Sequence, residues 1–153
     1  GSDPDAAIYW MCRMLEAGED PLFMARRMVV FASEDIGNAN PQALTLAIST
    51  MQAVDFIGMP EARIPLAQAA TYLASSPKSN ASYMALQLAT QDVTQKGNLP
   101  VPLHLRNAPT SLMKNLGYGE GYQYAHHYKE GKVSHPHLPD VLVGKKYYIS
   151  PNK

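Results

Sequence analysis

Apolar residues recur along the first two thirds of the chain at the spacing of an α-helix. Residues at i, i+3, i+4 and i+7 share one face of a helix. Four such sets are Ile8-Met11-Cys12-Leu15, Leu44-Ala47-Ile48-Met51, Leu66-Ala69-Ala70-Leu73 and Ala81-Met84-Ala85-Leu88. The pattern predicts helices over residues 4–17, 21–35, 41–57, 61–75, 80–95 and 109–116. We therefore expect an all-α bundle of about six helices.

Start and stop signals frame these segments. A dipeptide that ends in proline precedes most of them, and three of the five start with Asp or Asn: Asp3-Pro4, Asp20-Pro21, Asn40-Pro41, Met59-Pro60 and Ala108-Pro109. Asp and Asn side chains accept hydrogen bonds from unpaired N–H groups at a helix start, and proline fits the first helical position. Glycines that suit helix ends follow at positions 18, 37, 58, 97 and 117. Pro65 requires that the fourth helix start late or hold this proline in its first turn.

The pattern changes after Gly117. Residues 118–153 are rich in Gly, Pro, His and Tyr and show no helical period. We expect two parts: a helical bundle over residues 1–117 and an irregular extension over 118–153 packed on it. A short strand is expected near Lys146 to Ile149. A long irregular segment of this kind is usually either functional or mobile.

Composition narrows the class of protein. The chain has 153 residues, 46% of them hydrophobic and 17% charged, which is typical of one globular domain. No apolar run approaches the roughly 20 residues that span a bilayer, and the N-terminus does not resemble a secretory signal. The single cysteine, Cys12, indicates a reducing compartment and lies on an apolar stripe, where we expect a buried, inert thiol. Because the chain starts Gly-Ser-Asp-Pro, we expect it to be part of a longer protein.

The net charge is zero, but the charges are unevenly distributed. Residues 1–60 carry a net charge of −5 and residues 61–153 a net charge of +5. An acidic half and a basic half allow one-sided binding of a polyanion, or head-to-tail docking with a second copy. The alternative is a solvated surface with no partner.

The sequence offers little for catalysis. It lacks the Gly-x4-Gly-Lys-Ser/Thr phosphate loop, and the glycines at 117, 119 and 121 have no preceding strand or following helix. We expect this chain neither to bind nor to hydrolyse ATP. A more specific hypothesis is a metal-dependent hydrolase, whose metal ion would be bound by the cluster His126, His127, His135 and His137. No cysteine lies nearby and Asp140 is the only aspartate close to them, so exposed or ring-stacked histidines are the favoured interpretation, and no metal site is assigned.

Cations and aromatic rings alternate in the basic half. Six tyrosines between residues 118 and 148 stand among the lysines Lys114, Lys129, Lys132, Lys145 and Lys146. Stacking rings beside cations favour single-stranded nucleic acid; the alternative is that the tyrosines pin an irregular tail to the bundle. Two polar loops, residues 76–80 and 102–109, also place cations near helix starts. Candidate DNA- or anion-binding residues are Lys78, Ser79, Asn80, His104, Arg106, Asn107, Lys114, Tyr118 and Tyr122. For Ser79 and Asn80 simple helix capping is the favoured alternative.

Several segments together resemble a known family. They are GSDPDA at 1–6, GEDPL at 18–22, ARR at 25–27, ASEDIGNA at 32–39, PKSNA at 77–81, HLRNAPT at 104–110, GYG at 117–119 and YAH at 124–126. The chain resembles the C-terminal region of the replication-associated recombination protein A family (RarA/MgsA, related to the eukaryotic Werner-helicase-interacting protein). The resemblance runs nearly end to end. One departure is His127, where the family usually has an acid, and this weakens any role assigned to that position.

The resemblance implies a AAA+ ATPase parent that acts at stalled replication forks and at junctions of single- and double-stranded DNA. Its ATP- and Mg²⁺-binding residues would lie upstream, so this chain would hold no cofactor. The region is expected to be helical, similar to the clamp-loader collar, and to hold the parent as a homotetramer in the cytoplasm, associated with the nucleoid. Replication-fork proteins are further possible partners. The alternative is a monomeric DNA- or partner-binding module.

The sequence also predicts where copies of the chain meet. Methionines and alanines at several helical positions would let helices approach closely and leave apolar surface for a neighbour. These residues are Met11, Met14, Met24, Met28, Met51, Ala69 and Ala70. We expect an interface of more than about 1,000 Å² in total.

Overall fold

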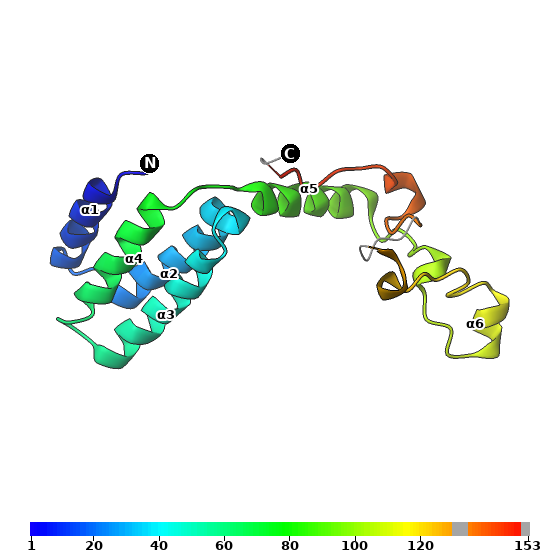
Figure 1. The fold of residues 1–153 in the computed structure, drawn as a ribbon, viewed down its shortest axis with the longest axis horizontal. Helices are drawn as coiled ribbons and strands as arrows, with labels where there is room; N and C mark the ends of the chain where they lie inside the picture. The colour runs from blue at the N-terminus through cyan, green and yellow to red at the C-terminus, as the bar shows by residue number, and fades with distance from the viewer. Residues whose placement is uncertain (130–134, 151–153) are drawn as a thin grey trace. The chain divides into compact units, whose positions relative to one another are not determined.

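The computed structural model describes residues 1–129 and 135–150. Over these residues it contains α-helices and short helical turns and no strand, which confirms the all-α expectation (Figure 1). The helices are α1 (Pro4–Glu16), α2 (Pro21–Phe31), α3 (Gln42–Ile57), α4 (Arg63–Ser75), α5 (Ala81–Lys96) and α6 (Ser111–Asn115). All six expected helices are therefore present, with ends close to those that the sequence predicts.

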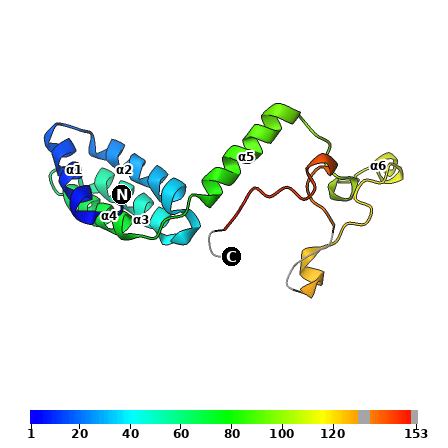
Figure 2. The same ribbon diagram turned by 90° about the horizontal axis from the view of Figure 1, so that it is seen from above.

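The chain forms two compact units. Unit 1 comprises Gly1–Leu88 together with the segment that starts at Tyr147, and unit 2 comprises Ala89–Lys146. The change from one unit to the other falls within α5, which Figure 2 shows as one continuous helix. The division of the sequence into a bundle over 1–117 and an extension over 118–153 stays a prediction.

Unit 1 is built on α4. Helix α1 packs on α4, while α2 and α3 pack on each other and on α4. Their contact surfaces form two apolar clusters: Met11, Leu15, Met24, Ala25, Val54, Ala62, Leu66 and Ala70 in the first, and Ala32, Ile36, Ala43, Ala47 and Leu73 in the second. All four residues of the stripe expected for α4 are buried. Many of these residues are alanines, so the helices can approach closely.

Two of the expected helix starts are confirmed and others shift. Asp3 accepts a hydrogen bond from the backbone N–H of Ala6 at 3.0 Å, and Asp20 from that of Leu22 at 2.9 Å. Asn40 does not cap α3 with its side chain, because its amide donates instead to the hydroxyl of Tyr72 at 2.9 Å.

The later starts also differ in detail. Helix α4 begins at Arg63 and holds Pro65 in its first turn, as the sequence requires, so the cis Met59-Pro60 pair lies in the preceding connection. Helix α6 is capped by Thr110, whose hydroxyl accepts from the N–H of Met113 at 3.2 Å, not by the pair at 108–109.

A tight backbone contact joins the end of α2 to the start of α5. Helix α2 continues into a π-helical turn, Ala32–Ile36, and Gly37 follows with φ +51°. The N–H of Ser79 donates to the carbonyl of Asp35 at 2.8 Å. A Cβ at Gly37 would lie 2.8 Å from the Ser79 carbonyl oxygen. Both the backbone angle and the space therefore require glycine here.

The expectation that Cys12 is buried is wrong, and the buried faces of two helices differ from their periodic apolar stripes. Cys12 is exposed, because α1 packs chiefly on α4 and its contact stripe is only Met11 and Leu15 wide. On α3 the buried residues are Ala43, Ala47, Thr50 and Val54, rotated from the predicted stripe. The only fully buried residue of α5 is Asp92. Hydrophobic periodicity predicts that a helix forms, but which face of the helix is buried depends on how many neighbouring helices pack against it.

Unit 2 contains α6 and several short turns. Asp92, on α5, pairs with Lys96 at 3.3 Å and also with Lys145. The strand expected near Lys146 to Ile149 is wrong, because these residues form neither a strand nor a bridge. Among the described residues, no helix is both long enough and apolar enough to cross a membrane.

Candidate nucleic-acid and assembly surfaces

Lys78 directs its ammonium group toward protein atoms. Its Nζ donates to the carbonyls of Leu73 at 3.0 Å, Ala74 at 3.2 Å and Ser76 at 2.5 Å, at the carboxyl end of α4. The Nζ atom of Lys78 also lies 5.9 Å from the centre of the Phe31 ring. A cation at the carboxyl end of a helix is stabilised by the helix dipole. With three acceptors for its three N–H groups, Lys78 closes α4 and does not present its charge to a phosphate.

Ser79 and Asn80 cap the start of α5, which is the alternative to anion binding that the sequence favours for them. The Ser79 hydroxyl accepts from the N–H of Ala81 at 3.3 Å, and the carbonyl of Asn80 accepts from the N–H of Met84 at 2.9 Å. Together with the contact to Gly37, these bonds fix the start of α5. The loop at 78–80 is thus explained by structure alone.

Arg106 and Tyr118 come together in unit 2. The guanidinium carbon of Arg106 lies 4.9 Å from the centre of the Tyr118 ring, and its Nε donates to the carbonyl of Val101 at 2.6 Å. Arginine stacked on an aromatic face keeps most of its N–H groups in the ring plane, directed outward. The pair can therefore present a cation to a phosphate group and a ring edge to a base of a nucleic acid.

The backbone holds this pair in place. The N–H of Gly119 donates to the carbonyl of Leu103 at 2.6 Å, which binds the glycine-rich turn to the loop before α6. A Cβ on Gly119 would lie 3.1 Å from the Arg106 carbonyl oxygen, so this approach also depends on glycine. Asn107, Lys114 and Tyr122 are exposed residues of the same unit.

His104 belongs to a group of imidazoles. Its ring centre is 5.0 Å from that of His135 and 6.4 Å from that of His137, and its Nε2 is buried without a hydrogen-bond partner among the residues that the structure describes. His126 and His127 lie elsewhere, each against the ring of Tyr124. The four histidines of the sequence cluster are thus divided between two places. Within residues 1–129 and 135–150, no group of three or more His, Cys, Asp and Glu side chains is arranged to hold a metal ion.

The charge asymmetry follows the two units. Unit 2 contains seven basic and four acidic residues and has a net charge of +3, while unit 1 has a net charge of −3. Lys132, one of the lysines in the predicted basic–aromatic region, lies outside the described residues. The candidates Arg106, Lys114, Tyr118 and Tyr122 all belong to the positive unit.

A different surface of unit 1 is apolar. At the turn from α3 to α4, the exposed fraction is 89% for Phe56, 71% for Ile64 and 44% for both Ile57 and Met59. We call these four residues the α3–α4 tip. The sequence analysis missed them, although one signal was available: a large aromatic residue at position 56 lies off the buried stripe of its helix.

The methionine and alanine positions expected at a subunit interface lie mostly inside unit 1. Met11, Met24, Ala69 and Ala70 are buried in its own core, and Met28 and Met51 pack against that core. Only Met14 is largely exposed, at 45%. Met11, Met24, Ala69 and Ala70 therefore do not face a neighbour, because they pack within one chain; that copies of the chain meet at an interface stays a prediction.

Comparison with known proteins identifies the family. The model of the family described as "MgsA AAA+ ATPase C terminal" matches residues 1–153. The chain belongs to this family. The resemblance read from the sequence motifs is therefore confirmed.

Several relatives of this MgsA family member share one name. "Replication-associated recombination protein A" of Coxiella burnetii is 49% identical over the whole chain, that of Escherichia coli K12 45%, and that of Bacillus subtilis 43% over 97% of the chain. The chain spans only 34–35% of the length of these relatives. It is thus similar to about a third of proteins named for replication-associated recombination, and its family is that of a AAA+ ATPase C-terminal region.

Proposed function

We propose that this chain is the homotetramerisation domain of a AAA+ ATPase that acts in DNA replication, recombination and the maintenance of stalled forks. Family membership supports the ATPase parent and its process. The α3–α4 tip supports self-association, because it exposes four large apolar side chains within one short turn. Contiguous exposed apolar surface of this kind marks interaction sites in soluble proteins.

The energetic argument is simple. Burying apolar surface contributes about 25 cal/mol per Å², and Phe56, with 89% of its surface exposed, contributes almost nothing to the fold of one chain. A second copy that covers the tip recovers this energy. Large aromatic side chains are also enriched at interface hot spots.

A matched pair of variants tests this assignment. Phe56→Glu places a charge in the tip, and Leu112→Glu places one at a similarly exposed position, 66%, on α6 of unit 2. We expect Phe56→Glu to lower the mass measured by light scattering at a fixed concentration and Leu112→Glu to leave it unchanged. Helical circular dichroism should be preserved in both. An unchanged mass for Phe56→Glu would remove the tip from the interface.

Catalysis is assigned to the parent. The chain has no phosphate-binding loop, so ATP and Mg²⁺ would be bound by the part of the protein that precedes it. We expect no ATP turnover by the purified chain. Turnover that persists through further purification steps would contradict this.

Contact with DNA forms the second part of the proposal, and the Arg106–Tyr118 pair supports it. The pair combines a cation with an aromatic ring in the positively charged unit, and Lys114 and Tyr122 are exposed there. Single-stranded nucleic acid is bound by such combinations of charge and stacking. Lys78, Ser79 and Asn80 are left out of this surface, because Lys78 binds the carbonyls at the end of α4 and the other two residues cap the start of α5. Because the net charge of the whole chain is zero, binding should be weak.

A monomeric DNA- or partner-binding module is the alternative. It predicts a monomer at all accessible concentrations with the Arg106–Tyr118 contact intact. The mass measurement and the DNA measurement are independent, so they separate the two functions.

A further inference from the structure

Unit 2 contains a pocket beside the Arg106–Tyr118 pair. Its volume is about 510 Å³, within the roughly 300–1,000 Å³ that is typical of ligand pockets. The lining residues come from two segments, 99–106 and 136–141, and all of them belong to unit 2. Arg106 is part of this lining and also stacks on Tyr118. A ligand in the pocket would therefore lie next to the surface that the proposed function assigns to DNA.

The pocket combines rigid apolar walls with two opposite charges. Proline has a fixed φ and no backbone N–H, so a wall built on prolines is rigid and poor in hydrogen-bond donors. Four of the lining residues are prolines, at positions 100, 102, 136 and 139. Arg106 supplies a cation and the exposed Asp140 a carboxylate, while the imidazole of His104 adds an aromatic ring. The pocket thus suits a flat group that donates hydrogen bonds and has a negative charge attached to it.

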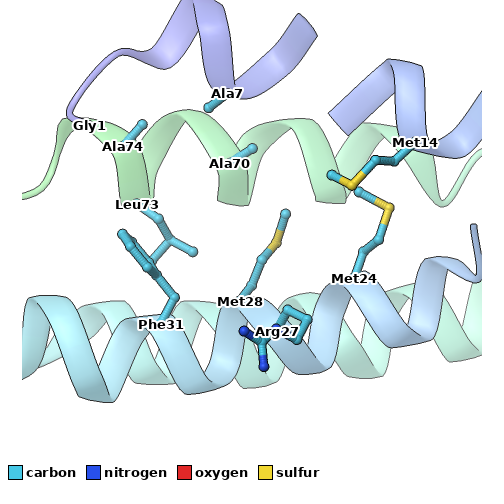
Figure 3. A pocket seen from close by; sticks show the side chains of 10 residues that line it. All are labelled: Gly1, Ala7, Met14, Met24, Arg27, Met28, Phe31, Ala70, Leu73 and Ala74. Carbon is cyan, nitrogen blue, oxygen red and sulfur yellow. The ribbon is translucent and has the colours of Figure 1, made fainter. Parts of the chain in front are cut away.

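A cleft in unit 1 shows what this lining adds. The cleft between α1, α2 and α4 has a volume of about 380 Å³, and Met14 and Met24 point toward each other at one end of it (Figure 3). Its only charged side chain among the described residues is Arg27. That cleft therefore offers apolar contact but no pair of opposite charges, whereas the pocket in unit 2 can recognise a ligand by its polar groups.

We propose that the pocket of unit 2 binds an unpaired cytosine of single-stranded DNA. The inference rests on the DNA contact in the proposed function and names the base that this surface recognises. The flat base lies between the apolar walls, its exocyclic amino group donates to the Asp140 carboxylate, and its phosphate pairs with Arg106. Aspartate that accepts from the amino group of cytosine is a recurrent base contact, and unpaired bases are recognised by stacking together with hydrogen bonds to their edges.

The lining favours cytosine over thymine. Cytosine carries an amino group that donates hydrogen bonds, whereas thymine presents a carbonyl oxygen at the same position of the ring. This oxygen would need a donor from a proline-rich wall and would lie against the Asp140 carboxylate, which only accepts hydrogen bonds when it is ionised. Thymine would therefore leave two acceptors facing each other, and such unpaired polar groups cost binding free energy.

The two charges also favour a nucleotide over a peptide. An acidic peptide would pair with Arg106 but would be repelled by Asp140. A basic peptide would pair with Asp140 but would be repelled by the positive charge of unit 2. A cytosine nucleotide satisfies both charged side chains, because its hydrogen-bond donor and its phosphate are separate groups of one molecule.

Binding of two single strands of equal length, oligo(dC) and oligo(dT), tests the proposal. Fluorescence anisotropy is measured at low salt and slightly alkaline pH, where cytosine strands do not pair with each other. We expect the chain to bind oligo(dC) roughly fivefold more tightly, the size expected for one net hydrogen bond. Equal affinity for the two strands would overturn the cytosine assignment and leave the DNA contact of Arg106 and Tyr118 standing. No binding to either strand would remove that contact as well.

A matched pair of variants locates the preference. Asp140→Ala and Glu120→Ala each remove one exposed carboxylate from unit 2, but only Asp140 lines the pocket. Both variants should bind DNA somewhat more tightly, because a negative charge is lost. Asp140→Ala should bring the affinities for the two strands within about twofold of each other, while Glu120→Ala should keep the roughly fivefold preference. A preference that survives Asp140→Ala would contradict the proposal.

Methyl NMR of the unaltered chain gives a second reading that does not depend on a variant. Val101 and Val141 line the pocket, and Val143 is an exposed residue of the same unit outside it. Oligo(dC) should shift the methyl signals of Val101 and Val141 and leave those of Val143 in place. Unshifted signals at Val101 and Val141 would show that the base lies elsewhere, and the proposal would be wrong.

Discussion

The two units of this chain are stabilised in different ways. Unit 1 has two buried apolar clusters, and Ile36 and Leu66 within them are fully buried. In unit 2, the only buried residue in the described part of the chain is a charged one, Asp92. Its remaining order comes from ion pairs, ring contacts and short backbone contacts such as that between Gly119 and Leu103.

This difference separates packing from polar contacts as sources of stability. Removing apolar area from water is the dominant favourable contribution to folding, and unit 1 has most of it. Val93, Leu112 and Val141 of unit 2 are 63–69% exposed. We therefore expect unit 2 to open locally at a smaller free energy than unit 1, which native-state hydrogen exchange measures. Equal protection in the two units would contradict the comparison.

The largest effect is expected from a cavity in unit 1. Leu66→Ala removes a side chain with 0% exposure and should lower the free energy of unfolding by about 2–5 kcal/mol. Leu112→Ala in unit 2, where the side chain is 66% exposed, should change it by less than about 0.5 kcal/mol. Urea unfolding of both variants measures the difference. Similar losses in the two would mean that unit 2 has a packed core after all.

A smaller loss is expected at the contact between Gly37 and Ser79. Gly37→Ala adds both a strained backbone angle and a clash with the Ser79 carbonyl, and should cost about 1–3 kcal/mol. Gly18→Ala is the control: φ is +91°, but a Cβ there meets nothing within 4 Å, so only the backbone strain of about 1 kcal/mol remains. Thermal unfolding compares them. An equal cost would show that the close approach to Ser79 relaxes freely.

A change at Asp92 tests how much polar contacts stabilise unit 2. Asp92→Asn removes the negative charge between Lys96 and Lys145, whose side chains are 39% and 40% exposed. Because both lysines can turn to water, we expect a loss of about 1–2 kcal/mol, below the cost of breaking a fully buried pair. Amide exchange should rise in unit 2 and stay constant in unit 1. Asp140→Asn, at an exposed site in the same unit, should have little effect.

The smallest expected effect concerns DNA. Two phosphate contacts to a single strand, from Arg106 and Lys114, imply a log–log salt slope of about −1.4, and Arg106→Ala should flatten it by about 0.7 at any base sequence. Arg63→Ala is the control, since Arg63 pairs with Glu16 in the acidic unit at 2.6 Å. Fluorescence anisotropy gives the slope, and a melting curve of each variant accompanies it. If Arg106→Ala unfolds the chain or leaves the slope unchanged, the DNA role of Arg106 is wrong.

How well the sequence predicts each part depends on the kind of force that forms it. Helix existence and position follow from periodicity and from caps such as Asp3 and Asp20, because these signals are local. Which face is buried does not follow, since it depends on neighbours that are distant in sequence. Cys12 is exposed for this reason, and the stripe of α3 is rotated. The structure of unit 2 rests on nonperiodic contacts, which the hydrophobic pattern of the sequence does not predict.

The candidate site shows the same limit. The polar loop at 102–109 indicated Arg106 and the basic–aromatic pattern indicated Tyr118, and the two side chains lie in contact, while their role in binding stays a prediction. The sequence could not distinguish them from Lys78, because composition does not show that three carbonyls at the end of α4 surround that ammonium group. Family membership, in contrast, was readable from the motifs alone, since the matching stretches run through the whole chain.

The central claim is that this chain associates with itself, and its mass in solution tests this most directly. Light scattering of the purified chain at tens of micromolar should give about four times the 16.8 kDa of one copy, with the mass falling on dilution. A mass of one copy at that concentration would contradict the claim and leave the monomeric binding module as the better account.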